Sequence, residues 1–302
     1  MSFEIVPPEA EEHLDWIALT DALAAGHSLR KAEIGDTFLY RDPDTLLSRA
    51  AWIDGLGMAV KTATIFPGNA AQGKPNVGGA VSVFSDVDGG VEAILDFSLV
   101  TKWKTAGDSL LAVRRLARPE SEVILLVGAG TVARSLREAY AAVWPGARFM
   151  VWSRSPDSAM SLAGMFDRTE AVRDLERGVA EADIIACATM ATDPILKGGW
   201  LRPGQHVDLI GAYRPDMREA DDAVLQRGCV FVDSFDTTLD HIGELKTPLA
   251  TGAITRADVV ADFYDLAAFT RAPDDITVFK NGGGAHLDLM TSRYILAAWQ
   301  AR

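Results

Sequence analysis

Hydrophobic residues in the second half of the chain form short continuous runs, separated by stretches in which apolar residues recur at helical spacing. The runs lie at residues 123–127, 149–152, 184–189, 206–211, 229–233 and 276–279. Continuous apolar runs of this length are typical of strands that are buried on both faces. The stretches between them, such as residues 134–144 and 174–182, predict helices. Strands that alternate with helices predict a parallel, doubly wound α/β sheet.

The first half of the chain mixes the two patterns. Helical spacing predicts helices at residues 9–25 and 43–54, with a loop at 35–43 between them. Strands are predicted at residues 58–66, 80–84 and 91–95, the last two joined by a hairpin turn at Asp88-Gly89-Gly90. Helices are predicted at residues 101–117 and 285–301. We therefore expect an α+β domain made of residues 1–118 and 285–302, and a nucleotide-binding domain made of residues 119–284.

Length and charge narrow the class of protein. A chain of 302 residues is long enough for about two domains with real cores. The net charge of −13 disfavours nucleic acid and anionic membranes as partners. No run approaches membrane-spanning length, the first residues lack the pattern of a secretory signal, and the histidines lack metal-ligand spacing. We expect a cytoplasmic enzyme, with Cys187 and Cys229 in its core rather than in a disulfide.

A glycine motif follows the run at residues 123–127 directly. Gly128-Ala129-Gly130-Thr131-Val132-Ala133 has the form G-x-G-x-x-A and lies between a predicted strand and a predicted helix. In a Rossmann-type fold the first glycine permits a tight turn, and the second lets the backbone approach a pyrophosphate at the helix N-terminus. The motif in this context predicts a dinucleotide site.

The tips of the following strands indicate which dinucleotide binds. Enzymes that use NAD usually carry an acid after the second strand, which accepts a hydrogen bond from the ribose. This chain has Ser153, Arg154 and Ser155 there, a set that suits the 2′-phosphate of NADPH, so NADH is the weaker candidate. An exposed arginine at a strand end is the alternative interpretation. The carboxyl ends of two later strands add Thr189, Gly211 and Ala212 as expected cofactor neighbours.

Several motifs together resemble the ornithine cyclodeaminase/μ-crystallin family. They are Val60-Lys61-Thr62 with Phe66-Pro67-Gly68-Asn69, residues 101–106, the glycine motif, residues 211–219, and Phe279-Lys280 with residues 282–288. The resemblance implies a substrate-binding and dimerisation domain joined to an NAD(P)-binding Rossmann domain, and a homodimer. It also implies a nicotinamide-dependent oxidoreductase with a small amino or imino acid as substrate.

The resemblance also implies roles for individual residues. Lys61 and Lys104 are the implied catalytic residues, with Lys104 standing where the family usually has an arginine that holds the substrate carboxylate. The implied substrate-binding residues are Arg41, Asn76 and Asp288. A solvent-exposed loop arginine is the alternative for Arg41, and a carboxylate that only caps or pairs a helix is the alternative for Asp288. The implied cofactor-binding set adds the remaining matched positions, which are Thr105, Ala129, Thr131, Val132, Met190, Lys280 and Gly282.

Tyr213 distinguishes this chain within the family. Ornithine cyclodeaminases carry an aspartate at the matching position, which binds the side-chain amine of ornithine, whereas this chain has Tyr213. We therefore expect NADPH-dependent reduction of a small cyclic imino acid, foremost Δ1-pyrroline-2-carboxylate to L-proline. The alternatives are an NAD-dependent ornithine cyclodeaminase or alanine dehydrogenase, and a non-catalytic, crystallin-like NADP-binding protein.

Overall fold

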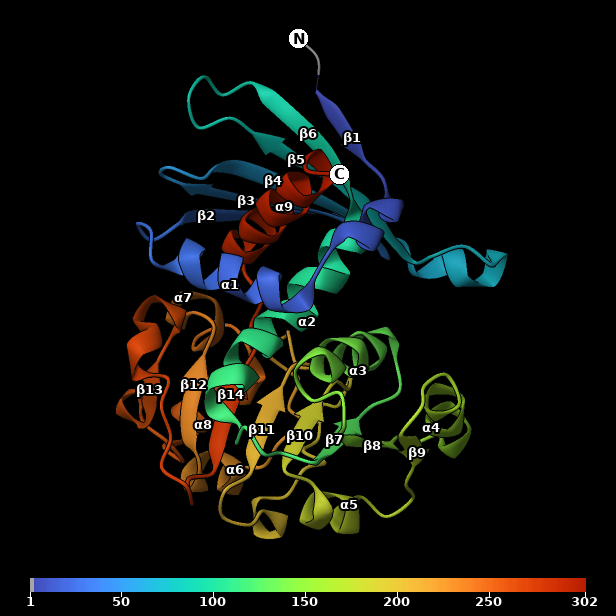
Figure 1. The fold of residues 1–302 in the computed structure, drawn as a ribbon, viewed down its shortest axis with the longest axis vertical. Coiled ribbons are helices and arrows are strands. Elements are labelled where there is room, and N and C mark those ends of the chain that lie inside the picture. Colours follow the sequence, from blue (N-terminus) through green and yellow to red (C-terminus); the bar gives the residue numbers. More distant parts are fainter. Residues whose placement is uncertain (1–2) are drawn as a thin grey trace. The chain divides into compact units, whose positions relative to one another are not determined.

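The computed structural model describes residues 3–302 and divides the chain into two units (Figure 1). One unit comprises Met1–Lys104 and Gly283–Arg302, and the other comprises Thr105–Gly282. The division falls inside helix α2 (Phe97–Leu116). The sequence places the corresponding boundary at residue 118, near the end of this helix.

The first unit contains a six-stranded sheet in the order β1-β6-β5-β4-β3-β2. Strand β1 pairs with β6 in parallel and the remaining pairs are antiparallel. Helix α9 (Ala285–Gln300) packs on the sheet, and α1 (Trp16–His27) packs on α9 (Figure 1). The strands are β1 (Glu4–Val6), β2 (Glu33–Arg41), β3 (Asp44–Ile53), β4 (Gly57–Ile65), β5 (Val77–Phe84) and β6 (Val91–Asp96).

Two predictions in this unit are wrong. Residues 35–43, expected as a loop, lie mostly in β2, and residues 43–54, expected as a helix, lie in β3. The apolar residues of β3 fit helical spacing in a short window, but the segment pairs on both sides, with β2 and with β4. This pairing satisfies its backbone hydrogen bonds, so tertiary contacts override a weak local pattern.

The second unit contains an eight-stranded, wholly parallel sheet in the order β13-β12-β14-β11-β10-β7-β8-β9. From β7 the chain proceeds through β8 to β9 on one side, and then returns to place β10 on the other side of β7. Such a reversal opens a crevice at the carboxyl ends of β7 and β10, where ligands of doubly wound sheets bind. The predicted doubly wound α/β fold is therefore confirmed.

Six of the eight strands of the second unit coincide with the apolar runs, and the short strands at residues 169–171 and 259–261 lie outside them. The strands are β7 (Val123–Val127), β8 (Arg148–Trp152), β9 (Thr169–Ala171), β10 (Ile184–Cys187), β11 (His206–Leu209), β12 (Cys229–Val232), β13 (Val259–Ala261) and β14 (Thr277–Lys280). The helices are α3 (Thr131–Val143), α4 (Pro156–Ala163), α5 (Leu175–Glu181), α6 (Asp222–Arg227), α7 (Phe235–Thr238) and α8 (Gly243–Thr251). Short 3₁₀ helices complete both units: η1 (Pro8–His13), η2 (Pro67–Gln72), η3 (Gly198–Trp200), η4 (Arg256–Asp258) and η5 (Phe263–Ala268).

The core of the second unit lies between its sheet and the surrounding helices. Side chains of the central strands, such as Leu125, Ile185 and Val207, are fully buried. Both cysteines are free, with Cys187 buried and Cys229 partly buried. Within residues 3–302, none of the helices is both long enough and apolar enough to cross a membrane.

Candidate nucleotide and substrate sites

The glycine turn joins β7 to α3 in the second unit. Gly128 has φ +122°, and a Cβ atom there would lie 2.5 Å from the carbonyl oxygen of Ala188, so the fold itself requires glycine. Gly130 is the N-cap of α3, and a Cβ atom there would meet no atom within 4 Å. Packing within residues 3–302 therefore does not require glycine at this position, and the close approach of a ligand to Gly130 stays a prediction. Ala133 is fully buried, as the motif requires.

The start of α3 fits an anionic group. Within residues 3–302 no side chain caps this helix, so the amide groups of its first turn, at Thr131 and Val132, have no side-chain acceptor there. A cavity of about 390 Å³ opens beside the turn. Its wall contains Gly128, Ala129, Gly130, Trp152, Ser153, Arg154, Ala188, Thr189, Met190, Ala191, Thr192, Asp193 and Ile195. A dinucleotide with its pyrophosphate on α3 fits these residues.

The tip of β8 carries the three predicted phosphate-binding residues. Arg154 is exposed, and its side chain has no hydrogen bond or ion pair within residues 3–302. Ser153 accepts a hydrogen bond from the amide of Ser155, and Ser155 caps α4 by accepting one from the amide of Ser158. The guanidinium of Arg154 is therefore available to an anionic ligand at the cavity wall.

Three other residues of the predicted cofactor set have partners within the second unit. Lys280 is fully buried, and its Nζ donates to the carbonyl oxygens of Leu209 (2.8 Å) and Asn281 (2.6 Å). The amide of Gly282 donates to Asp233, and the carbonyl oxygen of Thr105 accepts from Asn281. These groups hold the ends of strands β11 and β14. Lys280 thus fixes backbone at the ends of these strands, and its role toward the cofactor stays a prediction.

In the first unit, Lys61 on β4 pairs with Asp288 on α9. Lys61 Nζ lies 2.9 Å from Asp288 Oδ1, and both side chains are buried. Burial lowers the pKa of Lys61, Asp288 opposes this shift, and the charges of Lys104 and Arg49 lower the pKa further. Burial alone would raise the pKa of Asp288, but Lys61, Lys104 and Arg49 hold it below its usual value. Asp288 is therefore ionised, and its Oδ2 has no hydrogen-bond partner within residues 3–302.

Lys104 is buried and adds positive charge to this pair. The sequence places Lys104 near the start of a helix at residue 101, but α2 begins at Phe97. Lys104 therefore lies in the third turn, beyond the free amides of the helix N-terminus. Any carboxylate held by Lys104 must be bound by the ammonium group rather than by the helix end.

Arg49 is the residue that the sequence analysis missed. It lies directly opposite Lys61 in the β3–β4 register, and opposite Asp36 in the β2–β3 register. Its guanidinium donates to both oxygens of Asp36 at 2.8–3.1 Å. Because residues 43–54 were expected to form a helix, this cross-strand placement could not be foreseen.

Two predicted substrate residues lie elsewhere on the first unit. The side chain of Arg41 is 79% exposed and pairs with Asp44 at 2.6 Å. Asn76 is in the exposed loop before β5, where its Oδ1 accepts from the amide of Ala70 at 2.8 Å. Within residues 3–302, neither forms a hydrogen bond or ion pair with Lys61 or Asp288, so their role in binding substrate stays a prediction.

Comparison with known proteins identifies the family of the chain. Residues 52–302 match the model of the ornithine cyclodeaminase/mu-crystallin family. A Δ1-pyrroline-2-carboxylate reductase of Paracoccus denitrificans is 53% identical over 296 residues, which cover 95% of this chain and 94% of the relative. The structure of a Thermococcus litoralis Δ1-pyrroline-2-carboxylate reductase in complex with NADH and L-proline superposes with a TM-score of 0.89 at 22% identity, covering 99% of this chain and 98% of that one. An archaeal alanine dehydrogenase dimer with bound NAD gives 0.90 at 23% identity, covering 100% and 97%. The chain belongs to the ornithine cyclodeaminase/mu-crystallin family.

Proposed function

We propose that this protein reduces Δ1-pyrroline-2-carboxylate to L-proline with NADPH. The observation that carries the proposal is the charge of the buried cluster in the first unit. Lys61 and Lys104 are buried, and Lys61 pairs with the buried Asp288, while the half-buried Arg49 pairs with the partly exposed Asp36. Two buried ammonium groups, those of Lys61 and Lys104, beside one buried carboxylate, that of Asp288, favour an anion, and a small monocarboxylate would supply it. The relative at 53% identity supports the choice of substrate.

The cluster also suits the nitrogen of an imino acid. Lys61, Lys104 and Arg49 would bind the substrate carboxylate and orient the C=N bond. The unpartnered Oδ2 of Asp288 would accept a hydrogen bond from the protonated ring nitrogen, which keeps the substrate in the iminium form that accepts hydride most readily. Lys61, or a water that it holds, is the proposed proton source. The nicotinamide supplies the hydride, and the protein supplies position and electric field.

The preference for NADPH rests on the tip of β8. Arg154 is exposed, has no partner within residues 3–302, and lines the cavity beside the glycine turn. A guanidinium in this place suits a 2′-phosphate. Its neighbours are Ser153 and Ser155 rather than an acid that would accept a hydrogen bond from a free ribose hydroxyl. NADH is the weaker candidate.

Tyr213 argues against ornithine as the substrate. Its side chain is 56% exposed in the turn after β11, where the cyclodeaminases of the family carry a carboxylate. Without that carboxylate, the distal amine of ornithine lacks a partner. Alanine dehydrogenase activity is the second candidate, because the same cationic cluster would also bind the carboxylate of an open-chain amino acid.

One set of assays tests these alternatives. NADPH oxidation is measured with Δ1-pyrroline-2-carboxylate, Δ1-piperideine-2-carboxylate, and pyruvate plus ammonia, and ammonia release is measured with L-ornithine. The expected result is the highest kcat/KM with Δ1-pyrroline-2-carboxylate. Turnover confined to pyruvate plus ammonia would identify an alanine dehydrogenase instead. Nucleotide binding without turnover of any substrate would indicate a non-catalytic protein.

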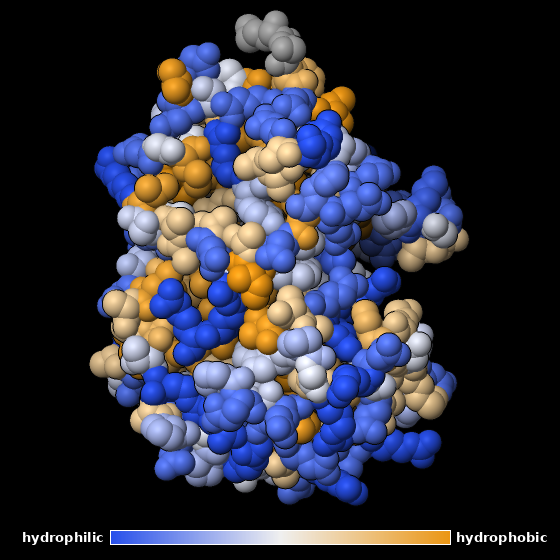
Figure 2. Space-filling view, in the orientation of Figure 1, coloured by the Kyte–Doolittle hydropathy of each residue, from blue (hydrophilic) through white to orange (hydrophobic). Residues whose placement is uncertain are grey.

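A homodimer is the proposed assembly. Strand β2 is the edge of its sheet, and all nine of its residues are exposed, among them Ile34, Phe38, Leu39 and Tyr40. Hydrophobic residues reach the surface in this part of the sheet (Figure 2). An exposed apolar edge strand presents unpaired backbone groups to another chain, which supports pairing with a second copy.

A further inference from the structure

We propose that Glu219 is a positioning residue for the nucleotide, because its buried carboxylate fixes the chain segments that leave β10 and β11. This inference rests on the proposed binding of a nicotinamide nucleotide by the second unit. It concerns a residue that does not face the cavity and that the sequence analysis did not select.

The carboxylate of Glu219 joins two segments that are distant in sequence. Its Oε1 accepts from the backbone amide of Thr189 (2.6 Å) and from the Thr189 hydroxyl (2.8 Å). Its Oε2 accepts from the amides of Gly211 (2.6 Å) and Ala212 (3.4 Å). Thr189 follows β10 and Gly211 follows β11, so one side chain sets the distance between two neighbouring strand ends. Ligands of doubly wound sheets bind at these ends.

Gly211 shows how closely the segments approach. A Cβ atom at Gly211 would lie 2.1 Å from the carbonyl oxygen of Thr189 and 2.5 Å from Glu219 Oε1. The absence of a side chain at Gly211 therefore permits the carboxylate to bridge the segments.

A second buried carboxylate holds Glu219 itself. Glu244 on α8 accepts from the amides of Glu219 (2.7 Å) and Ala220 (3.0 Å). Burial raises the pKa of Glu244 to about 7, and the neighbouring Glu219 raises it too, while Lys280 lowers it. The positive charge of Lys280 lowers the pKa of both glutamates, and its Nζ donates to the carbonyl oxygen of Leu209 at the end of β11.

The bridge requires a carboxylate rather than an amide. All four groups that contact Glu219 are N–H or O–H donors, and only a carboxylate accepts at both of its oxygens. In Glu219→Gln, an NH₂ group would replace one of the two acceptor oxygens. The donors that face this NH₂ group would lose their acceptor, and the two segments would separate. We therefore expect the variant to lose nucleotide affinity by more than its loss of stability explains.

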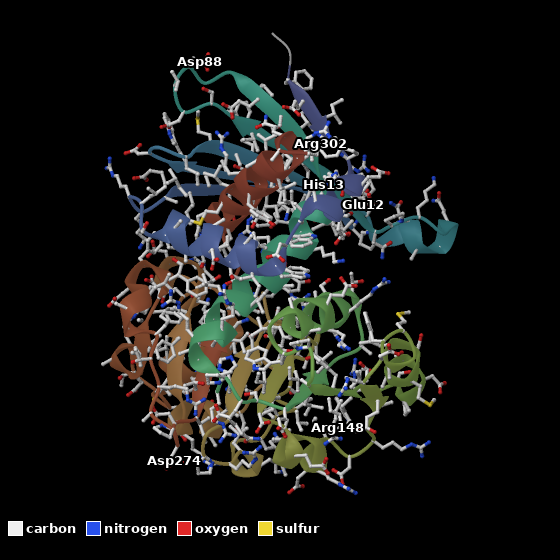
Figure 3. All side chains as sticks on the ribbon, in the orientation of Figure 1. Glu12, His13, Asp88, Arg148, Asp274 and Arg302 are labelled. Carbon is white, nitrogen blue, oxygen red and sulfur yellow. The ribbon has the colours of Figure 1, made fainter. Side chains whose placement is uncertain are left out.

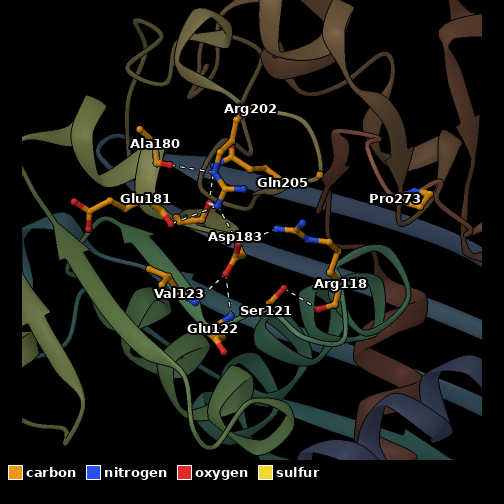
Figure 4. Close-up of polar contacts among 12 residues, drawn as sticks. Arg118, Ser121, Glu122, Val123, Ala180, Glu181, Asp183, Arg202, Gln205 and Pro273 are labelled. Carbon is orange, nitrogen blue, oxygen red and sulfur yellow. Dashed lines mark hydrogen bonds and ion pairs between the residues drawn. The ribbon is translucent and has the colours of Figure 1, made fainter.

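The same unit offers a matched control at the opposite ends of its strands. Asp183 precedes β10 and accepts from the amides of Glu122 (2.9 Å) and Val123 (3.1 Å), and it pairs with Arg118 and Arg202 (Figure 4). Figure 3 labels two residues at this end of the unit: Arg148, which is the first residue of β8, and Asp274, which precedes β14. Asp183 thus also bridges backbone segments, but away from the predicted nucleotide site.

The experiment compares Glu219→Gln with Asp183→Asn. The Kd for NADPH is measured by fluorescence titration, and the Tm of each protein is measured without nucleotide. We expect Glu219→Gln to raise the Kd at least tenfold, and Asp183→Asn to lower the Tm while its Kd stays within twofold of the wild-type value. An unchanged Kd in Glu219→Gln, or equal changes in both variants, would overturn the role of Glu219.

Glu219→Asp is the second variant if the glutamine protein does not fold. It keeps the charge but is one methylene shorter, so it cannot reach both segments, and a raised Kd is again expected. A wild-type Kd in this variant overturns the inference. The proposed function fails if the wild-type protein binds neither NADPH nor NADH. The inference on Glu219 alone fails if the wild-type protein binds nucleotide and the Glu219 variant binds it equally well.

Discussion

Cationic side chains on the first unit differ in their burial and their partners, and these differences distinguish the residues proposed to bind the substrate carboxylate from surface residues. Lys104 is buried and Arg49 is half-buried beside Lys61, so replacing either by Met should raise KM for the imino acid about 10- to 100-fold, as expected for a lost charge-assisted contact of about 1.5–3 kcal/mol. NADPH affinity should remain within about twofold, because the cluster belongs to the substrate side of the reaction. Steady-state kinetics and nucleotide titration measure both.

Substitutions of other cationic residues on the first unit provide the controls for the Arg49 and Lys104 variants. Lys102 pairs with Glu11 at 2.7 Å and Arg41 pairs with Asp44, so Lys102→Met and Arg41→Met should leave KM nearly unchanged. A large effect of Arg41→Met with none of Arg49→Met would restore the sequence-based choice of Arg41. Lys104→Arg should keep carboxylate binding, because arginine retains the charge and adds a bidentate geometry.

Arg154 is expected to choose between the two nicotinamide dinucleotides. Arg154→Ala should weaken NADPH binding by about 1.5–3 kcal/mol and leave NADH binding almost unchanged, because only NADPH carries the 2′-phosphate. Titration of both nucleotides against both proteins checks this expectation. Equal Kd values for NADPH and NADH in the wild-type protein would refute it.

His206 links the stability of one strand to pH. The Thr277 hydroxyl donates to the carbonyl oxygen of Leu116, so its oxygen must accept from His206 Nδ1, and Nε2 has no partner within residues 3–302. Burial, with a smaller effect of Arg271, lowers the pKa of His206 from 6.5 to about 3. Between these values the unfolded chain binds a proton that the folded chain rejects, so stability falls as the pH decreases below about 6.5.

The corresponding measurement is urea unfolding at pH 7.5 and 5.5. The wild-type protein should lose about 1 kcal/mol more than His206→Leu over this interval, because a single titrating group contributes about 1.4 kcal/mol per pH unit at most. The comparison cancels the other titrating groups, including Asp208, whose pKa burial raises to about 7. An identical pH dependence of the two proteins would contradict the assignment.

At the scale of one strand–turn–helix element, substitutions of the two motif glycines should have different effects, one on stability and the other on nucleotide affinity. Gly128→Ala introduces a Cβ at φ +122° and 2.5 Å from a backbone oxygen, so it should destabilise the fold by roughly 2–4 kcal/mol. Gly130→Ala meets no atom of the protein and has an ordinary φ of −88°, so its Tm should stay near the wild-type value. Its NADPH Kd should rise at least tenfold, because the new methyl occupies the expected path of the pyrophosphate.

Thermal unfolding and nucleotide titration distinguish the two effects. If Gly130→Ala binds NADPH as the wild-type protein does, the pyrophosphate does not lie on the start of α3. If Gly128→Ala is as stable as the wild-type protein, the turn has another conformation.

At the scale of the whole molecule, the edge of the first sheet should control assembly. Light scattering should give twice the chain mass of 32.5 kDa for the wild-type protein. Phe38 and Tyr40 stack on β2 with their ring centroids 6.1 Å apart, and Phe38→Lys should shift the protein toward monomers, because a charge would be buried on pairing.

The control for assembly is Val87→Lys in the hairpin turn between β5 and β6. Val87 is 96% exposed, and its neighbour Asp88 is labelled at the tip of this hairpin in Figure 3. This variant should leave the mass unchanged. A monomeric wild-type protein, or equal dissociation by both variants, would exclude pairing through β2.

The sequence by itself determined the doubly wound sheet, the glycine turn and the family. Runs such as residues 184–187 are buried on both faces, so their apolar character identifies them as strands without knowledge of their neighbours. The turn at Gly128 and Gly130 is likewise local, because its glycines serve the backbone of adjacent residues.

Only the tertiary structure decided which distant side chains meet. Arg49 lies opposite Lys61 because β3 pairs with β4 in one register, and Glu219 reaches Thr189 because two strands end side by side. Half-exposed antiparallel strands such as β2 and β3 carry a weak local pattern, and their backbone hydrogen bonds are satisfied only by partners elsewhere in the chain. The contacts around Arg49 and Glu219 therefore depend on long-range pairing, which no short window of sequence encodes.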